Sequence, residues 1–293
     1  MEIKLPANKK YVFAVSGGVD SMTLLYLANS LKEKNNWQII VSHINHGIRP
    51  DSALDEELVR QYCLSQNLIF ESVKLKLKPD ASEALSRSLR YQFLEAVAKK
   101  HQADAIVTAH HQDDLIETAI INLIRGTGRK GLSAMIDNQN RLRPLLKYSK
   151  ADIKQYAINQ GITWLEDSTN QDTKYLRNYI RLNIVPKLDV SARTKLLDII
   201  YNVSELNRSI DVILQVYVNS EIIDRNWFIL LDHKLACEVL AAWLRFNSIS
   251  NFNKLMLERL AVSAKVARVG QSFPVKNSRG LIINSGNISL TSV

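Results

Sequence analysis

The sequence is poor in cysteine, and this scarcity removes several classes of protein from consideration. Only Cys63 and Cys237 occur among its 293 residues, far apart and in segments with helical patterns. Two such residues provide neither a disulfide framework nor a cysteine-rich zinc site. The chain also lacks a Cys-x-x-Cys pair for sulfur chemistry. We therefore expect both thiols to pack in the interior.

Long apolar runs are also missing. Every run is far shorter than the ~18 residues of a membrane-spanning helix, and the N-terminal MEIKLPANKK has no hydrophobic leader segment. We therefore predict a cytoplasmic protein with no membrane association. Hydrophobic residues still make up 46% of the chain, enough for the interior of one large domain or, as we expect, of two.

Positive charge, by contrast, is in excess. The formal net charge is +9, and residues 125–187 alone hold 12 Lys or Arg against 5 Asp or Glu. Because basic side chains bind phosphate groups regardless of nucleotide sequence, a polyanion such as RNA is an obvious partner. Composition alone is equally consistent with a merely basic surface.

The first half of the chain alternates between strand-like and helix-like patterns. The predicted strands are 11–15, 37–42, 69–75 and 105–108, and the predicted helices are 21–34, 52–66, 82–101 and 113–125. Two weaker strands, 142–146 and 163–165, flank a helix at 150–159. This alternation predicts an α/β fold: a doubly wound, mainly parallel sheet with helices on both faces.

The pattern changes at Pro186, where a helix predicted from residue 175 ends. Beyond it we expect helices at 191–218, 234–246 and 253–267, and two short strands around a Ser-Gly-Asn turn in the terminal LIINSGNISLTSV. We therefore predict a first domain over residues 1–188, followed by a smaller, mostly helical domain ending in short strands over 189–293.

The stretch SGGVDS lies between the first predicted strand and its helix. Consecutive glycines let a backbone approach a phosphate, and serine hydroxyls and a helix N-terminus add donors. No Walker-type Gly-x-x-x-x-Gly-Lys sequence is present. A carboxylate beside phosphates repels them unless Mg²⁺ bridges the two, so Asp20 is a candidate magnesium ligand. A tight turn with a helix cap would explain the glycines, but not Asp20 together with Ser21.

Polar side chains gather at the ends of two other predicted strands. SHINHGIR supplies His43, Asn45, His46 and Arg49, and TAHHQDDLIET supplies His110, His111, Asp113, Asp114 and Glu117. Both groups should lie near the phosphate loop, because the carboxyl ends of parallel strands share one edge of a sheet. A metal-dependent hydrolase is an alternative that would leave the loop unexplained. Helix capping accounts for one carboxylate but does not need three.

Three further stretches are basic or rich in polar groups. SRSLRY places Arg87 and Arg90 on one helical face, where a solvated surface is the alternative to a functional role. The glycine-rich RGTGRKGLSAM is typical of an irregular loop that closes over a ligand, and it contains Arg125, Gly126, Arg129 and Lys130. EDSTNQDTKYLRNYIR carries more polar groups than a structural segment usually does: Asp167, Ser168, Asn170, Arg177, Asn178 and Arg181.

These stretches resemble known families. SGGVDS is similar to the phosphate loop of the PP-loop ATP pyrophosphatases, which cleave ATP between its α and β phosphates to adenylate a substrate. The loop alone is also similar to that of tRNA thiolases, GMP synthetase and NAD synthetase. In this order over residues 11–188, the other stretches resemble the bacterial tRNA(Ile)-lysidine synthetases: HINHGIR, SRSLRY, TAHHQDDLIET, RGTGRKGLSAM, RPLL and EDSTNQDTKYLRNYIR. LAAWLR and VKNSRGLIINSGNISL resemble that family's middle domain.

The resemblance implies a fold of the PP-loop (adenine nucleotide α-hydrolase-like) type and a reaction that uses ATP, Mg²⁺ and free L-lysine. The substrate would be the wobble cytidine in the CAU anticodon of an isoleucine tRNA. Adenylation would come first, because an oxygen of cytosine is otherwise a poor leaving group. The ε-amine of lysine would then displace AMP to give lysidine.

The same resemblance implies roles for the candidate residues. ATP would be bound by Ser16, Gly17, Gly18, Val19, Asp20, Ser21, His43, Arg125 and Gly126, with Asp20 also holding Mg²⁺. The lysine substrate would be bound by Asp113, Asp114 and Glu117. Catalysis would involve Asp20, Asp114, Arg87 and Arg90. The tRNA would be contacted by Arg129, Lys130, Arg177, Asn178 and Arg181.

Several alternatives stay open. Many members of the family carry a further C-terminal domain, which we expect to be absent here. Another PP-loop enzyme such as a tRNA thiolase is disfavoured by the missing cysteine pair, and a non-catalytic RNA-binding protein is a third class. The sequence leaves open the oligomeric state, a homodimer included, and the means of rejecting the CAU-bearing methionine tRNA.

Overall fold

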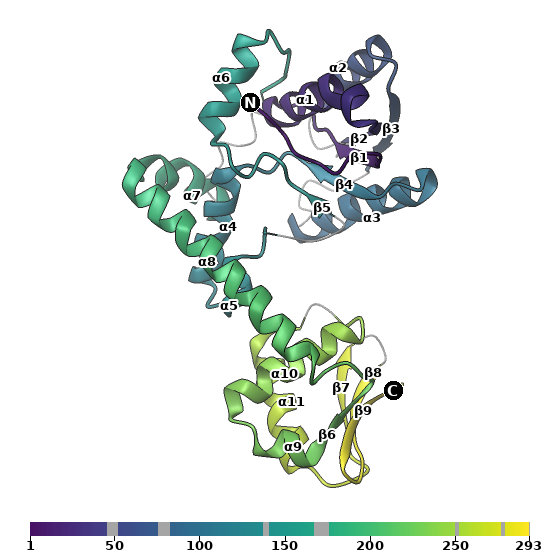
Figure 1. The fold of residues 1–293 in the computed structure, drawn as a ribbon, viewed down its shortest axis with the longest axis vertical. Helices are drawn as coiled ribbons and strands as arrows, with labels where there is room; N and C mark the ends of the chain where they lie inside the picture. The colour runs from purple at the N-terminus through teal and green to yellow at the C-terminus, as the bar shows by residue number, and fades with distance from the viewer. Residues whose placement is uncertain are drawn as a thin grey trace. The chain divides into compact units, whose positions relative to one another are not determined.

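The computed structural model describes residues 1–45, 52–75, 83–136, 141–166, 176–249, 252–276 and 279–292 (Figure 1). Backbone packing divides the chain into two compact units: Met1–Asn122 with Ala134–Leu197, and Leu123–Ser133 with Asp198–Val293. The division falls within helix α8 (Val190–Gln215). The two functional domains expected over 1–188 and 189–293 stay a prediction.

Five parallel strands form the sheet of the first unit, in the order β3-β2-β1-β4-β5. They are β1 (Lys10–Ala14), β2 (Gln38–Asn45), β3 (Ile69–Lys74), β4 (Ala105–Thr108) and β5 (Arg141–Leu142). From β1 the chain runs outward through β2 and β3, then returns to β4 and β5 on the other side. The order therefore reverses between β1 and β4, the position where such sheets bind ligands beyond the strands' carboxyl ends. The predicted doubly wound, parallel sheet is confirmed.

Successive side chains of the central strand point to opposite faces, and helices cover both. Val12 of β1 is fully buried and packs with Leu94 of α3 (Glu83–His101). Phe13 belongs to the larger cluster on the other face, which includes Leu25 of α1. Figure 1 shows α1 and α2 on one side of the sheet and α3 on the other. The helices on the larger cluster's face are α1 (Val19–Asn35), α2 (Ser52–Ser65) and α6 (Lys150–Asn159).

The last predicted strands of the first half differ from the structure. Strand β5 has only two residues, and the chain turns directly after it. Residues 163–165 form no strand: the Leu165 N–H instead donates to the Gly17 carbonyl at 3.1 Å. Residues 163–165, predicted to form an edge strand of the sheet, therefore stabilise the glycine turn instead. The helix predicted up to residue 185 divides into α7 (Leu176–Asn183) and a 3₁₀ turn at Val185–Lys187.

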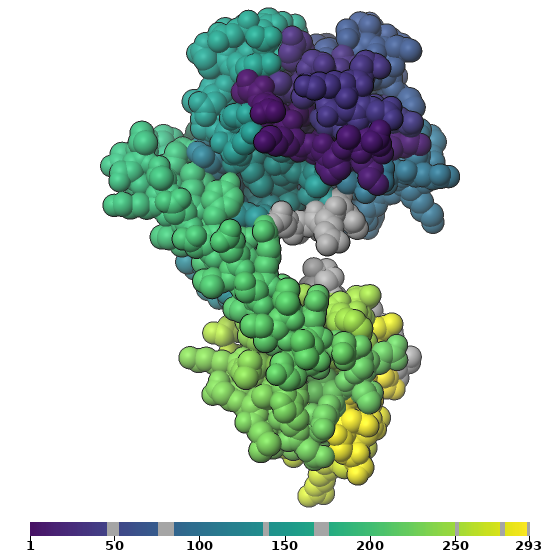
Figure 2. Space-filling view, viewed as in Figure 1, coloured from purple at the N-terminus to yellow at the C-terminus, as the bar shows by residue number. Residues whose placement is uncertain are grey.

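The second unit combines helices with an antiparallel sheet in the order β6-β9-β8-β7. Its buried centre surrounds Trp243. Figure 2 shows the C-terminal residues, in yellow, at the surface on one side of this unit. Besides the C-terminal part of α8, its helices are α9 (Arg225–Leu230), α10 (His233–Phe246) and α11 (Lys254–Val266). Its strands are β6 (Ile222–Asp224), β7 (Ser272–Lys276), β8 (Arg279–Ile283) and β9 (Asn287–Ser292).

The predicted pair of terminal strands around the Ser-Gly-Asn turn is confirmed by β8 and β9. Gly286 has a φ of +86° in the turn, a conformation that glycine adopts readily. The sequence did not predict β6, β7 or α9, since elements of three to six residues give little periodic signal.

The sequence has no long apolar run and only two cysteines, and the structure bears on the expectations drawn from both. None of the described helices is long and apolar enough to cross a membrane. Cys63 is buried, which raises the pKa of its thiol to about 12, whereas Cys237 is only partly buried. Interior packing is therefore confirmed for Cys63 and incomplete for Cys237.

Candidate functional site

The stretch Ser16–Ser21 forms a closed turn between β1 and α1. Gly17 has a φ of +92°, and a Cβ there would lie 3.2 Å from Cβ and Oδ1 of Asp55. The Ser21 hydroxyl accepts from the Ser16 N–H at 3.1 Å and donates to the Gly18 carbonyl at 2.9 Å. Gly18, the N-cap of α1, provides no side-chain acceptor for the first-turn amides. These amides can therefore bind an anion.

The two carboxylate oxygens of Asp20 have different surroundings. Oδ2 accepts a hydrogen bond from Lys150 Nζ at 2.6 Å and lies 3.8 Å from His111 Nε2. Oδ1 is buried and has no hydrogen-bond partner among the described residues. Burying a carboxylate oxygen without a donor is costly, so this atom fits a cation ligand. Mg²⁺ usually takes one or two carboxylates together with substrate phosphates, so one protein ligand suffices.

Lys150, the first residue of α6, was missed by sequence reasoning. Ser149 and Asp152 form a full capping box that starts the helix here. The Lys150 N–H donates to Asp113 Oδ2 at 2.6 Å, while its Nζ reaches Asp20. The capping pair can be read from the sequence, but the contact with a residue 130 positions away cannot.

The first two carboxylates of α4 (Gln112–Ile124) connect backbone segments. Asp113 accepts from the Lys150 N–H and pairs with Arg193. Asp114 Oδ2 accepts from the His111 N–H at 3.1 Å, so it caps the helix as the structural alternative supposed. Burial acts to raise the pKa of Asp114, but the neighbouring cations and the His111 hydrogen bond hold it below its usual range.

Glu117, the third carboxylate, is the most enclosed, at 1% exposed. It forms a two-pronged ion pair with Arg181, with Nε–Oε1 at 2.7 Å and Nη2–Oε2 at 2.9 Å. Arg181 Nη2 also lies 3.2 Å from Asp114 Oδ1. Burial raises the pKa of Glu117 although Arg181 opposes the shift. Arg181, predicted to bind tRNA, is thus a partner of the acidic residues in this structure.

His43, predicted to bind ATP, lies against the backbone that enters the loop. Its Nδ1–H donates to the Val15 carbonyl at 2.9 Å, and burial lowers the pKa of the ring, which keeps it neutral. Asn45, at the end of the same strand, is buried and donates to Glu56. Five candidates lie outside the described residues: His46, Arg49, Asp167, Ser168 and Asn170.

The glycine-rich stretch after α4 is more regular than predicted. It includes a one-turn helix, α5 (Arg129–Leu132), and belongs to the second unit together with the exposed Arg125 and Gly126. Arg129 pairs with Glu238 at 2.9 Å and donates to Asn207 at 2.7 Å, and Lys130 pairs with Asp211 at 2.6 Å. The predicted roles of these four residues in binding ATP or tRNA stay predictions.

The remaining predicted arginines lie in the first unit. Arg177 donates to Thr118 Oγ1 of α4 at 3.1 Å, and Asn178 follows it on α7. Arg87 and Arg90 lie on α3, with their guanidinium carbons 5.2 and 5.4 Å from the ring centre of Tyr91. The structure thus brings Arg177 to the helix that carries the acidic residues.

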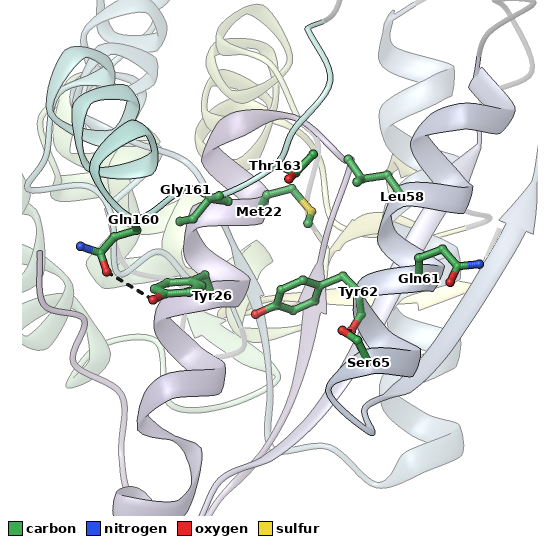
Figure 3. Close-up of a pocket in the computed structure, with 10 residues that line it drawn as sticks. Met22, Tyr26, Leu58, Gln61, Tyr62, Ser65, Gln160, Gly161 and Thr163 are labelled. Atoms are coloured by element: carbon green, nitrogen blue, oxygen red, sulfur yellow. Dashed lines mark hydrogen bonds between the residues drawn. The ribbon is translucent and has the colours of Figure 1, made fainter.

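A hollow of about 480 Å³ lies between α1, α2 and the end of α6, and none of the predicted residues lines it. Figure 3 shows Tyr26 and Tyr62 facing each other across it, with the Tyr26 hydroxyl donating to Gln160 Oε1 at 3.2 Å. The hollow could not be predicted from a local pattern, because its lining residues come from α1, from α2 and from the segment 160–163 that follows α6.

Among the described residues, no group of three His, Cys, Asp or Glu is able to hold a metal, and His46 of the hydrolase alternative lies outside them. A parallel sheet with a glycine turn and a helix N-terminus at its switch point instead defines an α/β phosphate-binding protein. Residues 2–188 match the family model described as the PP-loop domain. The chain therefore belongs to the PP-loop domain family, which supports the use of ATP.

Curated proteins from several bacteria are similar to this chain over more than half of its length. The chain is 39% identical over 189 residues to the tRNA(Ile)-lysidine synthase of Thermotoga sp. (strain RQ2), a match that covers 62% of this chain and 46% of that protein. The enzyme of the same name from Enterococcus faecalis is 37% identical over 188 residues, with 62% and 41% covered. The match thus spans less than half the length of these curated relatives.

A solved structure with the same fold is the U34-tRNA thiolase NcsA from Methanococcus maripaludis. Its TM-score is 0.59 at 18% sequence identity, and the match covers 69% of this chain and 73% of that one. At this identity the likeness extends to the fold alone.

Proposed function

We propose that this protein is a ligase that forms a C–N bond, converting the wobble cytidine in the CAU anticodon of an isoleucine tRNA to lysidine. One observation carries the proposal: a glycine turn, an Asp20 oxygen without a hydrogen-bond partner among the described residues, and the carboxylates of α4 meet at the switch point of the sheet. The similarity to proteins named tRNA(Ile)-lysidine synthase supports it over the same region.

In the first step, the turn Ser16–Ser21 would bind the phosphates of ATP through backbone amides and serine hydroxyls. Asp20 would hold Mg²⁺, which when bound neutralises phosphate charge. A carbonyl oxygen of cytosine attacks the α-phosphorus, and pyrophosphate leaves. Lys150 already contacts Asp20, so we assign its ammonium to the same phosphates. Arg87 and Arg90 are assigned to charge that develops on the phosphates or the activated base.

In the second step, the ε-amine of lysine attacks the activated carbon and AMP leaves. A lysine ammonium must first lose a proton, because only the neutral amine is a nucleophile. Asp114, with its lowered pKa, suits the binding of the ammonium group. Glu117, with a pKa raised by burial, is the stronger base and suits the removal of the proton. Arg181 now occupies both carboxylates, so lysine binding requires it to share or release them.

The decisive experiment incubates the protein with an unmodified isoleucine tRNA transcript, ATP, Mg²⁺ and labelled lysine, followed by nucleoside analysis. We expect labelled lysidine, and pyrophosphate release beyond one equivalent of enzyme only when both tRNA and lysine are present, because adenylation itself can occur once without lysine. Asp20→Asn should lower the rate by about 10²–10³-fold, through weaker phosphate and metal binding. Asp198→Asn, on an exposed stretch of α8, is the matched control. Equal turnover by the Asp20 variant and the wild type would remove the loop assignment.

The same assay separates the alternative classes. A thiolase would ignore lysine, and a non-catalytic RNA-binding protein would release no pyrophosphate. The thiolase structure is described with a [4Fe-4S] cluster, and such clusters are held by several cysteine thiolates. This sequence has two cysteines in all, which supports the ligase over that class. A cytoplasmic location and a homodimer are part of the proposal that fractionation and light scattering would test.

A further inference from the structure

Four guanidinium groups surround one buried tyrosine in the first unit. The guanidinium carbon of Arg141 lies 4.0 Å from the ring centre of Tyr91, and those of Arg87 and Arg90 lie 5.2 and 5.4 Å away. Arg143 is the fourth, and its positive charge also acts on Tyr91. Arg87, Arg90, Arg141 and Arg143 are called the arginine cluster below.

Negative charge does not balance this cluster. Among the described residues, only Arg141 has a carboxylate partner, Glu95 at 2.8 Å. Arg143 donates from Nη1 to the Met135 carbonyl, and its Nε is buried without a hydrogen-bond partner. Burial lowers the pKa of Arg90 and of Arg143. Partly buried cations without counter-charge are destabilising, so the folded protein retains them at a cost that a bound anion would offset.

Tyr91 supplies a second, independent observation. The residue is 7% exposed, and its buried hydroxyl has no partner in good hydrogen-bond geometry among the described residues, although Arg90 and Arg143 are near enough for Tyr91 to raise their pKa values. Burial acts to raise the pKa of this phenol, but Arg87, Arg90 and Arg143 outweigh it and lower the pKa. The hydroxyl is therefore a good donor within a positive field.

The cluster adjoins the candidate site at the same edge of the sheet. His110 lies two residues beyond β4, and its pKa is lowered to about 3 by burial and by the positive charges of Arg143, Arg90 and Arg87. Arg177 acts on Arg90 of the cluster and also on Glu117 of α4. The cluster and the acidic residues of α4 therefore act on the same two neighbours, His110 and Arg177.

We propose that Arg87, Arg90, Arg143 and the Tyr91 hydroxyl form an oxyanion site that binds one phosphate group. This deepens the proposed function, on which it rests for the source of the phosphate. The source is either the backbone of the RNA or the pyrophosphate portion of the nucleotide. Guanidinium groups suit both, since their planar donors match phosphate oxygens. Arg141 lies outside the site because Glu95 already neutralises it.

The test measures two affinities by titration calorimetry: inorganic pyrophosphate, and the unmodified tRNA transcript at fixed salt. Arg90→Gln and Arg143→Gln should weaken at least one of them by about tenfold or more, as expected for lost charged hydrogen bonds. Loss of pyrophosphate binding alone identifies the nucleotide as the source, and loss of tRNA binding alone identifies the RNA backbone. Unchanged affinity for both ligands overturns the proposal.

Two control variants make the result specific. Arg60→Gln removes an arginine on α2 that is paired with Glu56 and stacked on Phe70, away from the cluster. Arg141→Gln removes the cluster's neutralised member. Both should change the affinities less than about twofold, the weak effect of a compensated surface charge. A tenfold loss in Arg60→Gln would instead indicate a general charge effect and overturn the site.

A third variant guards against misfolding. Should an arginine variant fail to fold, Tyr91→Phe retains the ring and loses only the hydroxyl. It should weaken the affected ligand about threefold, as for one hydrogen bond, and an unchanged affinity overturns the proposal. Labelled-lysine incorporation by the wild type is scored separately. Phosphate binding at the cluster without incorporation would remove the proposed reaction and leave the oxyanion site standing.

Discussion

Two sets of basic side chains in this protein differ in how their charge is balanced. Arg129, Lys130 and Arg181 each pair with a carboxylate within hydrogen-bond distance. In the arginine cluster, Arg87, Arg90 and Arg143 have no such partner among the residues that the structure describes. The resemblance in sequence implied binding or catalytic roles for members of both sets, without showing which of them pair with a carboxylate. The comparison shows which arginines can bind a ligand. An arginine that pairs with a carboxylate stabilises the fold, whereas one without a carboxylate partner is available to an anion.

The sharpest contrast is between Arg181 and Arg90. Arg181→Gln leaves the buried Glu117 without its ion pair, and breaking such pairs costs about 3 kcal/mol of stability. Arg90→Gln removes an uncompensated charge, so the ligand-free protein should be as stable as the wild type or more stable. Urea unfolding at neutral pH measures both. A large loss of stability in Arg90→Gln would show that an unrecognised partner holds it, and would break the comparison.

A smaller effect is expected in the second unit. Arg129 is 19% exposed on its side chain and joins Glu238 to Asn207, so Arg129→Gln should cost about 1–2 kcal/mol. Lys130→Gln should cost about 0.5 kcal/mol, because its pair with Asp211 is more exposed. Unfolding followed by tryptophan fluorescence ranks the two. If Arg129→Gln were as stable as the wild type but bound tRNA more weakly, Arg129 would be a ligand-binding residue and not one that stabilises the fold.

The pH dependence of stability tests the burial of His110, whose pKa is lowered mainly by burial and further by the arginine cluster. The pKa of His110 is about 3 in the folded protein and about 6.5 when unfolded, so the unfolded state alone takes up a proton between these values. Stability should therefore be complete above pH 6.5 and fall as the pH drops, by up to about 1.4 kcal/mol per pH unit. His110→Gln should reduce this slope between pH 6.5 and 5, and His233→Gln, an exposed control, should not. Equal slopes in wild type and His110→Gln would contradict the buried, neutral ring.

The smallest expected effect concerns salt. Repulsion within the cluster should be screened as ionic strength rises, so the advantage of Arg90→Gln over the wild type should shrink by a few tenths of a kcal/mol. Phosphate should stabilise the wild type more than chloride does at equal ionic strength, and should lose this advantage in Arg143→Gln. Melting temperatures in matched buffers give both comparisons. If phosphate and chloride changed the melting temperature of the wild type equally, charge screening alone would explain the effect and no phosphate site would be needed.

The order of elements in the first unit could be predicted because short apolar strands alternate with helices that have a clear apolar period. Strand β4 has the predicted bounds, and most helices agree within two residues. The strand expected at 163–165 failed because its Leu165 N–H bonds to the loop rather than to a neighbouring strand. Such a choice depends on tertiary contacts that a local pattern does not contain.

The candidate site divides in the same way. The glycine turn and the acidic start of α4 are local patterns, and the sequence indicated both. Lys150 was not singled out in the sequence, and Tyr91 and Arg143 appeared only as parts of SRSLRY and RPLL. Their contacts with Asp20, the surrounding arginines and the Met135 carbonyl come from the fold. For the same reason, the sequence could not show that Arg181 pairs with Glu117 while Arg90 pairs with no described carboxylate.

The most direct test of the account is pyrophosphate release from ATP by the wild type and Asp20→Asn, with tRNA and lysine added singly and together. The account predicts sustained release, beyond one equivalent of enzyme, only when isoleucine tRNA and lysine are both present, with lysidine as the modified nucleoside, and about 10²–10³-fold slower release by the variant. Sustained release that is independent of lysine, or equally fast in Asp20→Asn, would contradict it.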